Sequence, residues 1–429
     1  MRLIRVPRFA PLMTWKGRFL GAAEDIGRLG FVLESAGSKF LFDYGMEPDK
    51  PPQYPLPAPP IDRVFLTHAH LDHSGMIPWV AARYDASILC TPPTQEVATL
   101  MHRDSLKIAR SEGFPEPYGD ADIEAAIAQT EHMDFTHPKP LGHHTLRLHS
   151  AGHIPGASQM ELKGPNGTLV FTGDLYTRPQ RLVMAAHQTR CDVLFMESTY
   201  AGREHPARED VERDFVAFAQ DVKGRGGILL VPAFAVGRAQ EIAMVLAGKG
   251  FNVWMDGMAR AVAKIYAQYP DYLEDFSAYQ RALANVKMVH NHRGRSNALR
   301  EADVIVTTGG MMDGGPILWY LDHVRNDPKS AVALTGYQVE GTNGRRLRDE
   351  GIVDFEPDEP GTRVHKIECE VRHFDFSAHA GHKDLVAFAK ATRAKDVVLF
   401  HGDKREMLVD DLSDFATVHL PMRDQEFVL

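Results

Sequence analysis

The stretch THAHLDHSG, at residues 67–75, directly follows the apolar residues 64–66 (VFL). Within six positions it holds three histidines and one aspartate, namely His68, His70, Asp72 and His73. Packing alone does not require so many polar side chains after a buried strand. Neutral imidazoles and carboxylates are ligands of catalytic zinc sites. The stretch therefore predicts a metal site at the end of a strand, and with it the fold that carries such a site.

The spacing within this stretch indicates two ions. If residues 67–71 leave the strand extended, His68 and His70 project to the same side, as side chains two positions apart do, and can share one ion. Asp72 and His73 are adjacent in the sequence and diverge. If a helix then begins at Ser74, these two residues face a second ion beside the first.

Two further ligands are expected at the ends of other strands. His153 in SAGHIPGAS and Asp174 in VFTGDLY each follow an apolar run and lie next to a glycine. Asp174 could bridge two cations with its two carboxylate oxygens. A single histidine at a strand end is usually a hydrogen-bonded polar residue, but this combination of residues favours metal binding over chance.

The length and composition are those of a globular protein with two domains. The chain has 429 residues, of which 44% are hydrophobic and 24% charged. No apolar run approaches the roughly 20 residues that span a bilayer, and residues 1–19 lack the apolar core of a secretory signal, so we expect a cytoplasmic protein without a membrane partner. The isolated Cys90, Cys191 and Cys369 predict buried free thiols rather than a disulfide framework or a thiolate zinc site.

The net charge limits how the chain could bind nucleic acid. A formal charge of -9 at pH 7 does not favour non-specific binding to a polyanion, because phosphate contacts usually come from Lys and Arg. Any nucleic-acid site must then be local. The candidates are the basic clusters at residues 292–295 (HRGR) and 345–348 (RRLR), although each alone is typical of a solvated basic turn.

Up to about residue 200 the pattern is that of a β-rich domain. Short apolar runs separated by Gly and Pro predict strands at residues 30–34, 39–44, 63–67, 87–90, 168–172 and 192–196. Residues 101–129 are richer in alanine, which predicts helices there. A loop is predicted next, with five histidines that lack acidic partners at ligand spacing and are expected to be solvent or packing residues: His132, His137, His143, His144 and His149.

From Val211 the pattern changes to strands that alternate with helices. Val211, Phe215, Phe218 and Val222 form one apolar face of a helix. Strands are then predicted at residues 228–231, 252–255, 286–289, 303–306 and 331–334, with helices at 238–247 and 259–269. This alternation indicates a parallel sheet covered on both faces. After about residue 364 the first pattern returns, with a strand at 395–400 that ends at His401, so one domain interrupts another.

These residues together resemble the metallo-beta-lactamase superfamily, whose pattern is HAHLDH, then GH, then GD. Beyond Asp174 the sequence resembles the subgroup with the beta-CASP insertion, which includes ribonuclease J, Artemis and the endonuclease subunit of the mRNA polyadenylation machinery. The phrases that carry this resemblance are MESTYAGREH, VPAFAVGRAQE, MDGMA, GGMMDGGP, TGYQVEGTNGRRL, FDFSAHAGH and VVLFHGD. The resemblance implies an α/β fold: an αββα sandwich formed by residues 1–205 and 367–429, and a beta-CASP domain, a parallel sheet covered by helices, formed by residues 206–366.

The resemblance also implies the metal ligands. Two Zn²⁺ ions per chain would be held, the first by His68, His70 and His153 and the second by Asp72, His73 and His401, with Asp174 bridging the two. Asp43 in FLFDYG matches the family's first aspartate, which orients ligands. In the family the segment SAHA is often followed by Asp, whereas this sequence has Gly381 there.

The activity implied is hydrolysis of phosphodiester bonds in single-stranded RNA by a zinc-dependent, two-metal mechanism. In this subgroup a histidine at the place of His401 accompanies RNA substrates, whereas DNA-processing members have valine. His379 is the expected general acid, Glu197 its hydrogen-bonding partner, and Asp72 joins them as a catalytic residue. Neighbouring phosphates would be held by glycine-rich loops and nearby cations, and the expected residues are Gly310, Gly314, Gly315, Arg345 and Arg346.

The sequence is also compatible with three other functions: a DNA nuclease of repair, a non-catalytic RNA-binding subunit of a processing complex, and a small-ester hydrolase. The intact set of seven ligands argues against a non-catalytic subunit. The sequence leaves open endonuclease or 5′-exonuclease action and the oligomeric state, a homo-oligomer included. Neither the N-terminal RNA-binding domains of archaeal relatives nor the extra C-terminal domain of ribonuclease J is expected, so the choice of RNA would fall to the cleft between the two domains.

Overall fold

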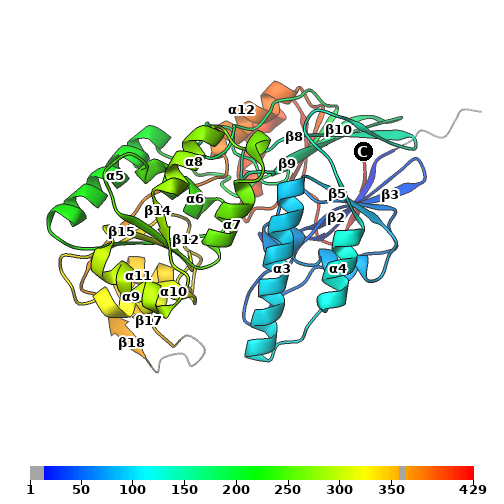
Figure 1. Ribbon diagram of the computed structural model, residues 1–429. Helices are drawn as coiled ribbons and strands as arrows, with labels where there is room; N and C mark the ends of the chain where they lie inside the picture. The colour runs from blue at the N-terminus through cyan, green and yellow to red at the C-terminus, as the bar shows by residue number, and fades with distance from the viewer. Residues whose placement is uncertain (1–13, 357–362) are drawn as a thin grey trace, which may run out of the picture.

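The computed structural model describes residues 14–356 and 363–429. Two lobes lie side by side, one with the blue and cyan N-terminal segments and the red C-terminal ones, the other green and yellow (Figure 1). The prediction that no secretory signal precedes the first domain rests mostly on residues 1–13, which lie outside the described residues. Within the described ranges, no helix is long and apolar enough to cross a membrane.

The first lobe contains two seven-stranded sheets. One has the spatial order β22 (Glu426–Val428), β1 (Lys16–Gly21), β2 (Gly30–Ser35), β3 (Ser38–Tyr44), β4 (Arg63–Phe65), β5 (Ser87–Cys90) and β6 (Thr130–His132). The other has the order β21 (Thr417–His419), β20 (Asp396–Phe400), β11 (Val193–Glu197), β10 (Gly167–Phe171), β9 (Ser158–Gly164), β8 (His144–Ser150) and β7 (Lys139–Leu141). C-terminal strands complete both sheets, as the sequence predicted.

Aromatic side chains pack the two sheets face to face. The ring centroids of Phe31 and Phe195 lie 4.7 Å apart, and those of Phe42 and Phe171 4.8 Å apart. Such large apolar rings dominate the burial that holds a core together. Outside the sheets lie α1 (Leu71–Ser74), α2 (Ile77–Ala81), α3 (Pro92–Glu112) and α4 (Asp120–Ala128) on one side, and α12 (His382–Thr392) and α13 (Val409–Ser413) on the other. The predicted αββα sandwich is confirmed.

The second lobe is built on a six-stranded sheet whose strands are all parallel. Its order is β14 (Val286–Met288), β13 (Val253–Asp256), β15 (Val304–Thr308), β12 (Leu229–Ala233), β16 (Ala331–Leu334) and β19 (Glu370–His373). One face packs against α5 (Arg208–Gly224), α6 (Arg238–Leu246) and α7 (Ala259–Tyr266), the other against α9 (His292–Glu301), α10 (Pro316–Val324) and α11 (Asn343–Glu350). This is the predicted parallel sheet covered on both faces.

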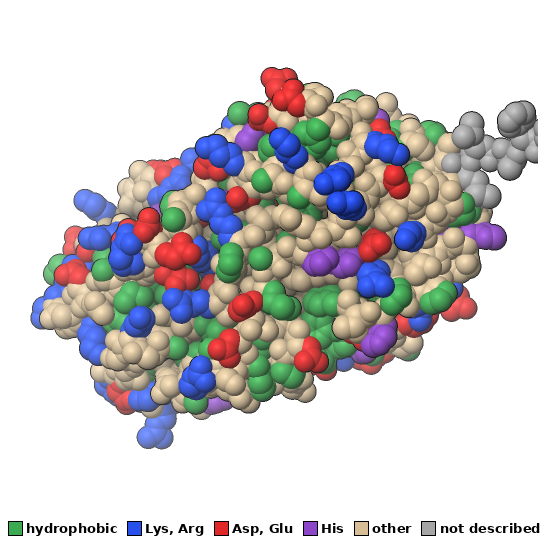
Figure 2. All heavy atoms as spheres, turned by 90° about the horizontal axis from the view of Figure 1, so that it is seen from above, with side chains coloured by type: hydrophobic (Ala, Val, Ile, Leu, Met, Phe, Trp, Pro, Cys, Tyr) green, Lys and Arg blue, Asp and Glu red, His purple; other side chains and the backbone are tan. Residues whose placement is uncertain are grey.

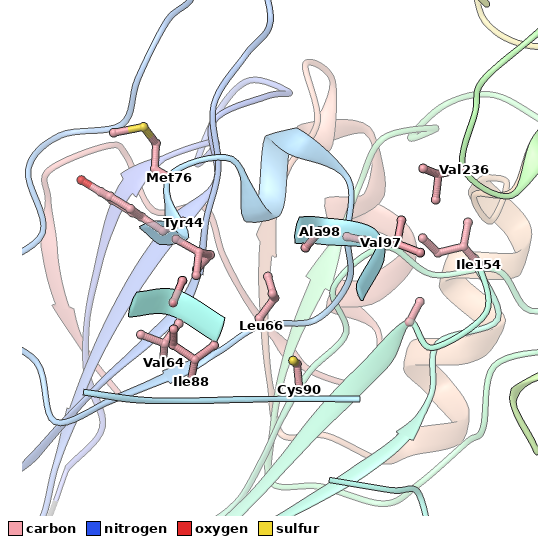
Figure 3. Close-up of a cluster of buried hydrophobic side chains, with 14 of the residues drawn as sticks. Tyr44, Val64, Leu66, Met76, Ile88, Cys90, Val97, Ala98, Ile154 and Val236 are labelled. Carbon is pink, nitrogen blue, oxygen red and sulfur yellow. The ribbon is translucent and has the colours of Figure 1, made fainter. Parts of the chain in front are cut away.

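One apolar cluster continues from the first lobe into the second. It includes Val64, Leu66 and Ile88 beneath the metal-binding stretch, and also Ile154 and Val236, which face each other in Figure 3. Residues of α6, α7 and α8 (Phe276–Ala284) belong to the same cluster. A buried apolar contact of this kind fixes the two lobes relative to each other more firmly than a polar interface would.

The predicted loop with five histidines is wrong, because most of it forms β6, β7 and β8. Buried and half-buried residues alternate along β8, as in a strand with one face in the core. Nε2 of His144 lies 2.9 Å from Oγ of Ser35, and Nε2 of His149 lies 2.6 Å from Oε2 of Glu161. The acidic partner of His149 is not apparent from the local sequence, because it lies on the neighbouring strand, β9.

Three other features also differ from the prediction. The helix after the HAHLDH stretch begins at Leu71 rather than Ser74. The basic clusters at 292–295 and 345–348 lie in α9 and α11 rather than in turns. Since β19 pairs with β16, the six-stranded sheet extends past the expected boundary at residues 366 and 367. The chain therefore returns to the first lobe only after His373.

The backbone at Gly45 lies very close to the backbone of Asp72 at the start of α1. A Cβ atom there would lie 1.7 Å from the carbonyl oxygen of Asp72. The substitution Gly45→Ala must therefore push α1 away, and overpacking of this kind costs about 1 to 3 kcal/mol. We expect a lower midpoint of thermal unfolding and a lower metal content by elemental analysis.

The matched control is Gly224→Ala at the end of α5, where nothing lies within 4 Å of the added Cβ. This variant should keep the parent's metal content, and its thermal midpoint should be equal to the parent's or slightly higher, because alanine favours the helix over glycine. A Gly45→Ala protein as stable and as rich in metal as the parent would contradict the assigned packing.

A candidate metal centre and its catalytic neighbours

The buried carboxylate of Asp43 positions the segment that carries most of the expected ligands. It lies near the end of β3, where the backbone is left-handed with φ of 54°. It accepts hydrogen bonds from the backbone N–H and the hydroxyl of Thr67 and from Nδ1 of His73, each at 2.7 Å. The Thr67 hydroxyl also lies 3.1 Å from Nδ1 of His68. One carboxylate thus fixes two imidazole rings.

The first group of converging side chains consists of three histidines and Asp174. Nδ1 of His70 lies 3.1 Å from Nε2 of His68 and 3.0 Å from Nε2 of His153. Oδ2 of Asp174 lies 3.4 Å from Nε2 of His68 and 3.6 Å from Nε2 of His153. The sequence predicted all four residues, and the structure brings them together.

The second group consists of Asp72, His73 and His401, from opposite ends of the chain. Oδ2 of Asp72 lies 3.5 Å from Nε2 of His401 and 3.7 Å from Nε2 of His73. The other oxygen of Asp174, Oδ1, lies 3.1 Å from Nε2 of His73. Asp174 therefore turns one oxygen to each group, which is the geometry of a bridging ligand.

The free atoms of these side chains fit bound cations. Nδ1 of His153 donates to the carbonyl oxygen of Ala378 at 2.8 Å, and Nδ1 of His401 lies 3.2 Å from the hydroxyl of Thr199. Histidines that bind metals usually have their second ring nitrogen held in this way. Within the described ranges, the buried Nε2 atoms of His73 and His401 and Oδ1 of Asp174 form no hydrogen bond of acceptable geometry, although Nε2 of His73 and Oδ1 of Asp174 lie 3.1 Å apart. Buried polar atoms are rarely left so, and a cation would satisfy all three.

The electrostatics of the group favour neutral imidazoles at His68 and His153, a protonated one at His73 and an ionised carboxylate at Asp174. Burial lowers the pKa of His68 to about 3 and that of His153 well below its usual range. Burial acts to raise the pKa of Asp174, but His73 and other histidines outweigh it and hold this pKa well below its usual range. At His73 the effect of burial is outweighed by Asp174 and Asp72, which raise its pKa well above the usual value. Positive charge is thus favoured between the carboxylates.

His379 stands beside the first group. Its Nδ1 lies 3.0 Å from Oε1 of Glu197, and its Nε2 lies 3.8 Å from Oδ2 of Asp174. The fully buried Glu197 also accepts the backbone N–H groups of Leu175 and Thr199, at 2.8 and 3.0 Å. Burial acts to lower the pKa of His379, but Glu197 and Asp174 outweigh it and raise this pKa to about 9. A protonated imidazole whose Nε2 faces the metal ligands is placed to donate a proton.

The expected substrate-binding residues lie in the second lobe. The loop between β15 and α10 contains Gly310, Gly314 and Gly315. The backbone N–H of Gly344 donates to the carbonyl oxygen of Met311 at 2.8 Å, which joins this loop to the start of α11. Arg345 lines a pocket together with Tyr200, whose ring centroid lies 6.0 Å from that of His379. Arg346 does not line this pocket.

Several supporting groups were not predicted from the sequence. The hydroxyls of Thr67 and Thr199 are adjacent to predicted residues or two positions from them, so a search of neighbours could have found them. The carbonyl of Ala378 gives no signal in a sequence. A Cβ at Gly381 would lie 3.3 Å from the carbonyl oxygen of Arg203, so glycine suits the tight packing after SAHA.

Comparison with family models agrees with this geometry. Residues 28–204 match the model described as metallo-beta-lactamase superfamily. Residues 239–347 match the Beta-Casp domain, and residues 364–418 match the Zn-dependent metallo-hydrolase RNA specificity domain. The three matches confirm the resemblance predicted from the sequence.

Relatives match over nearly the whole chain. The Methanocaldococcus jannaschii protein named Probable RNase MJ4 is 35% identical, over 94% of this chain and 96% of its own. RNase aCSPSF2 of Saccharolobus solfataricus is 31% identical, over 97% and 86%. Transcription termination factor FttA of Methanocaldococcus jannaschii is 32% identical, over 96% and 70%. A crystal structure of a protein of unknown function from Enterococcus faecalis covers 97% of this chain and 100% of its own with a TM-score of 0.63 at 14% identity, a likeness of fold alone.

The bridging geometry predicts that Asp174→Asn loses most of the bound metal. Asparagine has the same size but offers a single oxygen and no charge, so it cannot serve both groups. The metal content of the purified variant, measured by elemental analysis, should fall well below that of the parent.

The matched control is Asp134→Asn, which removes the carboxylate of an exposed Asp–His pair away from the site, where Nδ1 of His137 lies 2.9 Å from Asp134. It should keep the parent's metal content. An Asp174→Asn protein with unchanged metal content would show that Asp174 does not bridge.

Proposed function

Because the chain belongs to the metallo-beta-lactamase superfamily and contains a Beta-Casp domain, we propose that it is a metal-dependent ribonuclease that hydrolyses phosphodiester bonds of single-stranded RNA. One observation carries the proposal: two His/Asp groups share Asp174, and His379 stands beside them with its Nδ1 held by Glu197. The names of the two RNase relatives and the match to an RNA specificity domain support RNA as the substrate.

The proposal includes two Zn²⁺ ions per chain. Three histidines, His68, His70 and His153, would hold one ion, and Asp72, His73 and His401 the other, with Asp174 shared between them. Bound zinc supplies a nucleophilic water at neutral pH and offsets the negative charge of the phosphate. The histidine and carboxylate donor set, with cysteine absent from both groups, is that of a catalytic zinc site.

The chain's own residues would carry out the proton transfer. Nε2 of His379 is proposed to protonate the leaving oxygen, since it faces Asp174 across 3.8 Å while its other nitrogen is engaged. Glu197 would keep the ring in this orientation and stabilise its positive charge. Asp72 would act from the second group, where its Oδ2 faces His401.

RNA is favoured over DNA by His401, because the resemblance associates a histidine at this place with RNA substrates. The substrate strand would run between the lobes, with Arg345 beside it. The first lobe would comprise residues 1–205 together with the chain after the inserted sheet. A cytoplasmic location is proposed as well, and the three buried free cysteines support it.

The assigned role of His379 predicts that His379→Ala cleaves RNA about 10² to 10⁴-fold more slowly at unchanged metal content. The measurement uses zinc-loaded protein, end-labelled single-stranded RNA with a 5′-phosphate or a 5′-hydroxyl, and a DNA oligonucleotide of the same sequence. Internal products indicate endonuclease action, and single nucleotides released from the 5′ end indicate exonuclease action.

His137→Ala serves as the control, because the His137 side chain is exposed and away from the site. It should cleave at the parent's rate. Parental turnover by His379→Ala would remove this residue from the mechanism, and faster cleavage of DNA than RNA by the parent would overturn the substrate assignment.

A further inference from the structure

A pocket of about 350 Å³ opens where the segment after β11 meets the second lobe. Three stretches far apart in the sequence line it, and its residues include Tyr200, Arg203, Tyr337, Arg345, Arg348 and Asp375. The pocket borders the catalytic site, because Tyr200 also neighbours His379. Its volume is in the range of small-molecule sites and would accommodate a single nucleotide.

Two exposed aromatic side chains lie at or beside this pocket. Tyr337 is 40% exposed and Phe234 is 38% exposed. They follow the carboxyl ends of β16 and β12, which are paired parallel neighbours. A Cβ at Gly336 would lie 3.4 Å from Cε2 of Phe234, so the Phe234 ring lies against the backbone that leads into Tyr337. The two rings thus lie at the carboxyl ends of neighbouring parallel strands, where ligands of such sheets bind, with Tyr337 lining the pocket and Phe234 beside it, and we call the pair the aromatic platform.

Two guanidinium groups beside the platform lack an acidic partner. Within the described ranges, no carboxylate oxygen lies within 4.0 Å of the side-chain nitrogens of Arg203 or Arg238. The guanidinium carbon of Arg203 lies 5.5 Å from the ring centroid of Tyr337. Arg238 is partly buried, lies against Gly336 and donates to the carbonyl oxygen of Thr335.

The other charged side chains that line the pocket are of both signs, and they include Glu204, whose Oε1 accepts the backbone N–H of Lys383 at 3.1 Å. Arg345 and Arg348 both contact the carboxylate of Asp349. Asp375 is paired with His205 at 2.7 Å. On the face seen in Figure 2, basic and acidic side chains are interspersed over the surface rather than gathered by sign. Near the platform, the positive charges without an acidic partner are those of Arg203 and Arg238, within the part of the chain that the structure describes.

We propose that this pocket holds one unpaired nucleotide of the substrate strand next to the scissile phosphate, with its base stacked on the platform of Phe234 and Tyr337 and its phosphate beside Arg203 and Arg238. The inference rests on the proposed ribonuclease function and adds a positioning subsite to it. Aromatic rings stack on any base, so the subsite tolerates every sequence but requires a base whose face is free. A base within a duplex has its faces covered and is excluded.

The test removes the aromatic faces while keeping apolar bulk. Tyr337→Leu and Phe234→Leu, singly and together, are made in the full-length, zinc-loaded chain. For the double variant we expect KM for a single-stranded RNA to rise about 5- to 100-fold, with kcat and zinc content unchanged. The Kd of the same oligonucleotide, measured by fluorescence anisotropy in the His379→Ala background, should rise equally.

Two controls separate stacking from general damage. Tyr337→Phe keeps the ring and should bind like the parent. Phe251→Leu removes a ring that precedes β13, at the opposite edge of the same sheet, and should also change nothing. Arg203→Ala should lower the slope of log Kd against log salt by about one unit, as expected for one lost phosphate contact.

An oligonucleotide series with one abasic position at a time locates the subsite. One abasic position should weaken binding to the parent but not to the double variant. Parental affinity in the double variant, with cleavage intact, would overturn the subsite and leave the ribonuclease assignment standing. A parent that binds the oligonucleotide through the platform but does not cut it would instead overturn the ribonuclease assignment and support the subsite.

Discussion

The hydrogen bonds of Asp43 are the constraint on which the rest of the site depends. A buried carboxylate is costly to ionise, and burial does raise the pKa of Asp43, although His73 and Thr67 oppose that rise. Its three 2.7 Å hydrogen bonds hold Thr67 and His73, and through the threonine hydroxyl they orient His68 as well. The imidazole rings of His68 and His73 are left with Nε2 pointing towards the carboxylate of Asp174. The ligand geometry is therefore set by β3, a strand that contributes no ligand itself, before any ion binds.

The convergence of these side chains could be predicted from the sequence because most of them follow apolar strands, and the ends of neighbouring strands meet on one side of a sheet. His68 to His73, His153 and Asp174 could be identified from that pattern, whereas His401, Glu197 and His379 required the family resemblance. The error at His144 and His149 has a different origin. The partner of His144, Ser35, lies on β2 of the opposite sheet, and the partner of His149, Glu161, lies on the neighbouring strand β9. In addition, a histidine in an alternating pattern is taken for a polar residue even where it faces the core.

The position of His379 depends on both lobes. It lies in the segment that leaves β19 of the inserted sheet and enters α12 of the first lobe. The buried guanidinium of Arg208 at the start of α5 donates to the carbonyl of Ser377 and to Oε1 of Glu241, while Glu241 accepts the backbone N–H groups of 181 and 182 from the first lobe. A buried pair of this kind contributes little net stability, but its fixed geometry specifies how the segments meet. The inserted lobe thus helps to position His379, the proposed proton donor.

Charge decides how such a chain could hold a polyanion. With a net charge of -9, a broad basic surface is not the means of attraction, and Arg345 and Arg348 share the single carboxylate of Asp349. Under the proposed function, the phosphates would contact the candidate metal groups around Asp174, the guanidinium groups of Arg203 and Arg238, and the positive charge that Asp349 leaves unbalanced on Arg345 and Arg348. Few phosphate contacts imply a shallow dependence of affinity on salt, because each contact releases about one counterion. Under the proposed function, contacts with bases would supply the rest of the binding free energy, and the exposed rings of Phe234 and Tyr337 at the carboxyl ends of neighbouring strands of the inserted sheet suit such contacts.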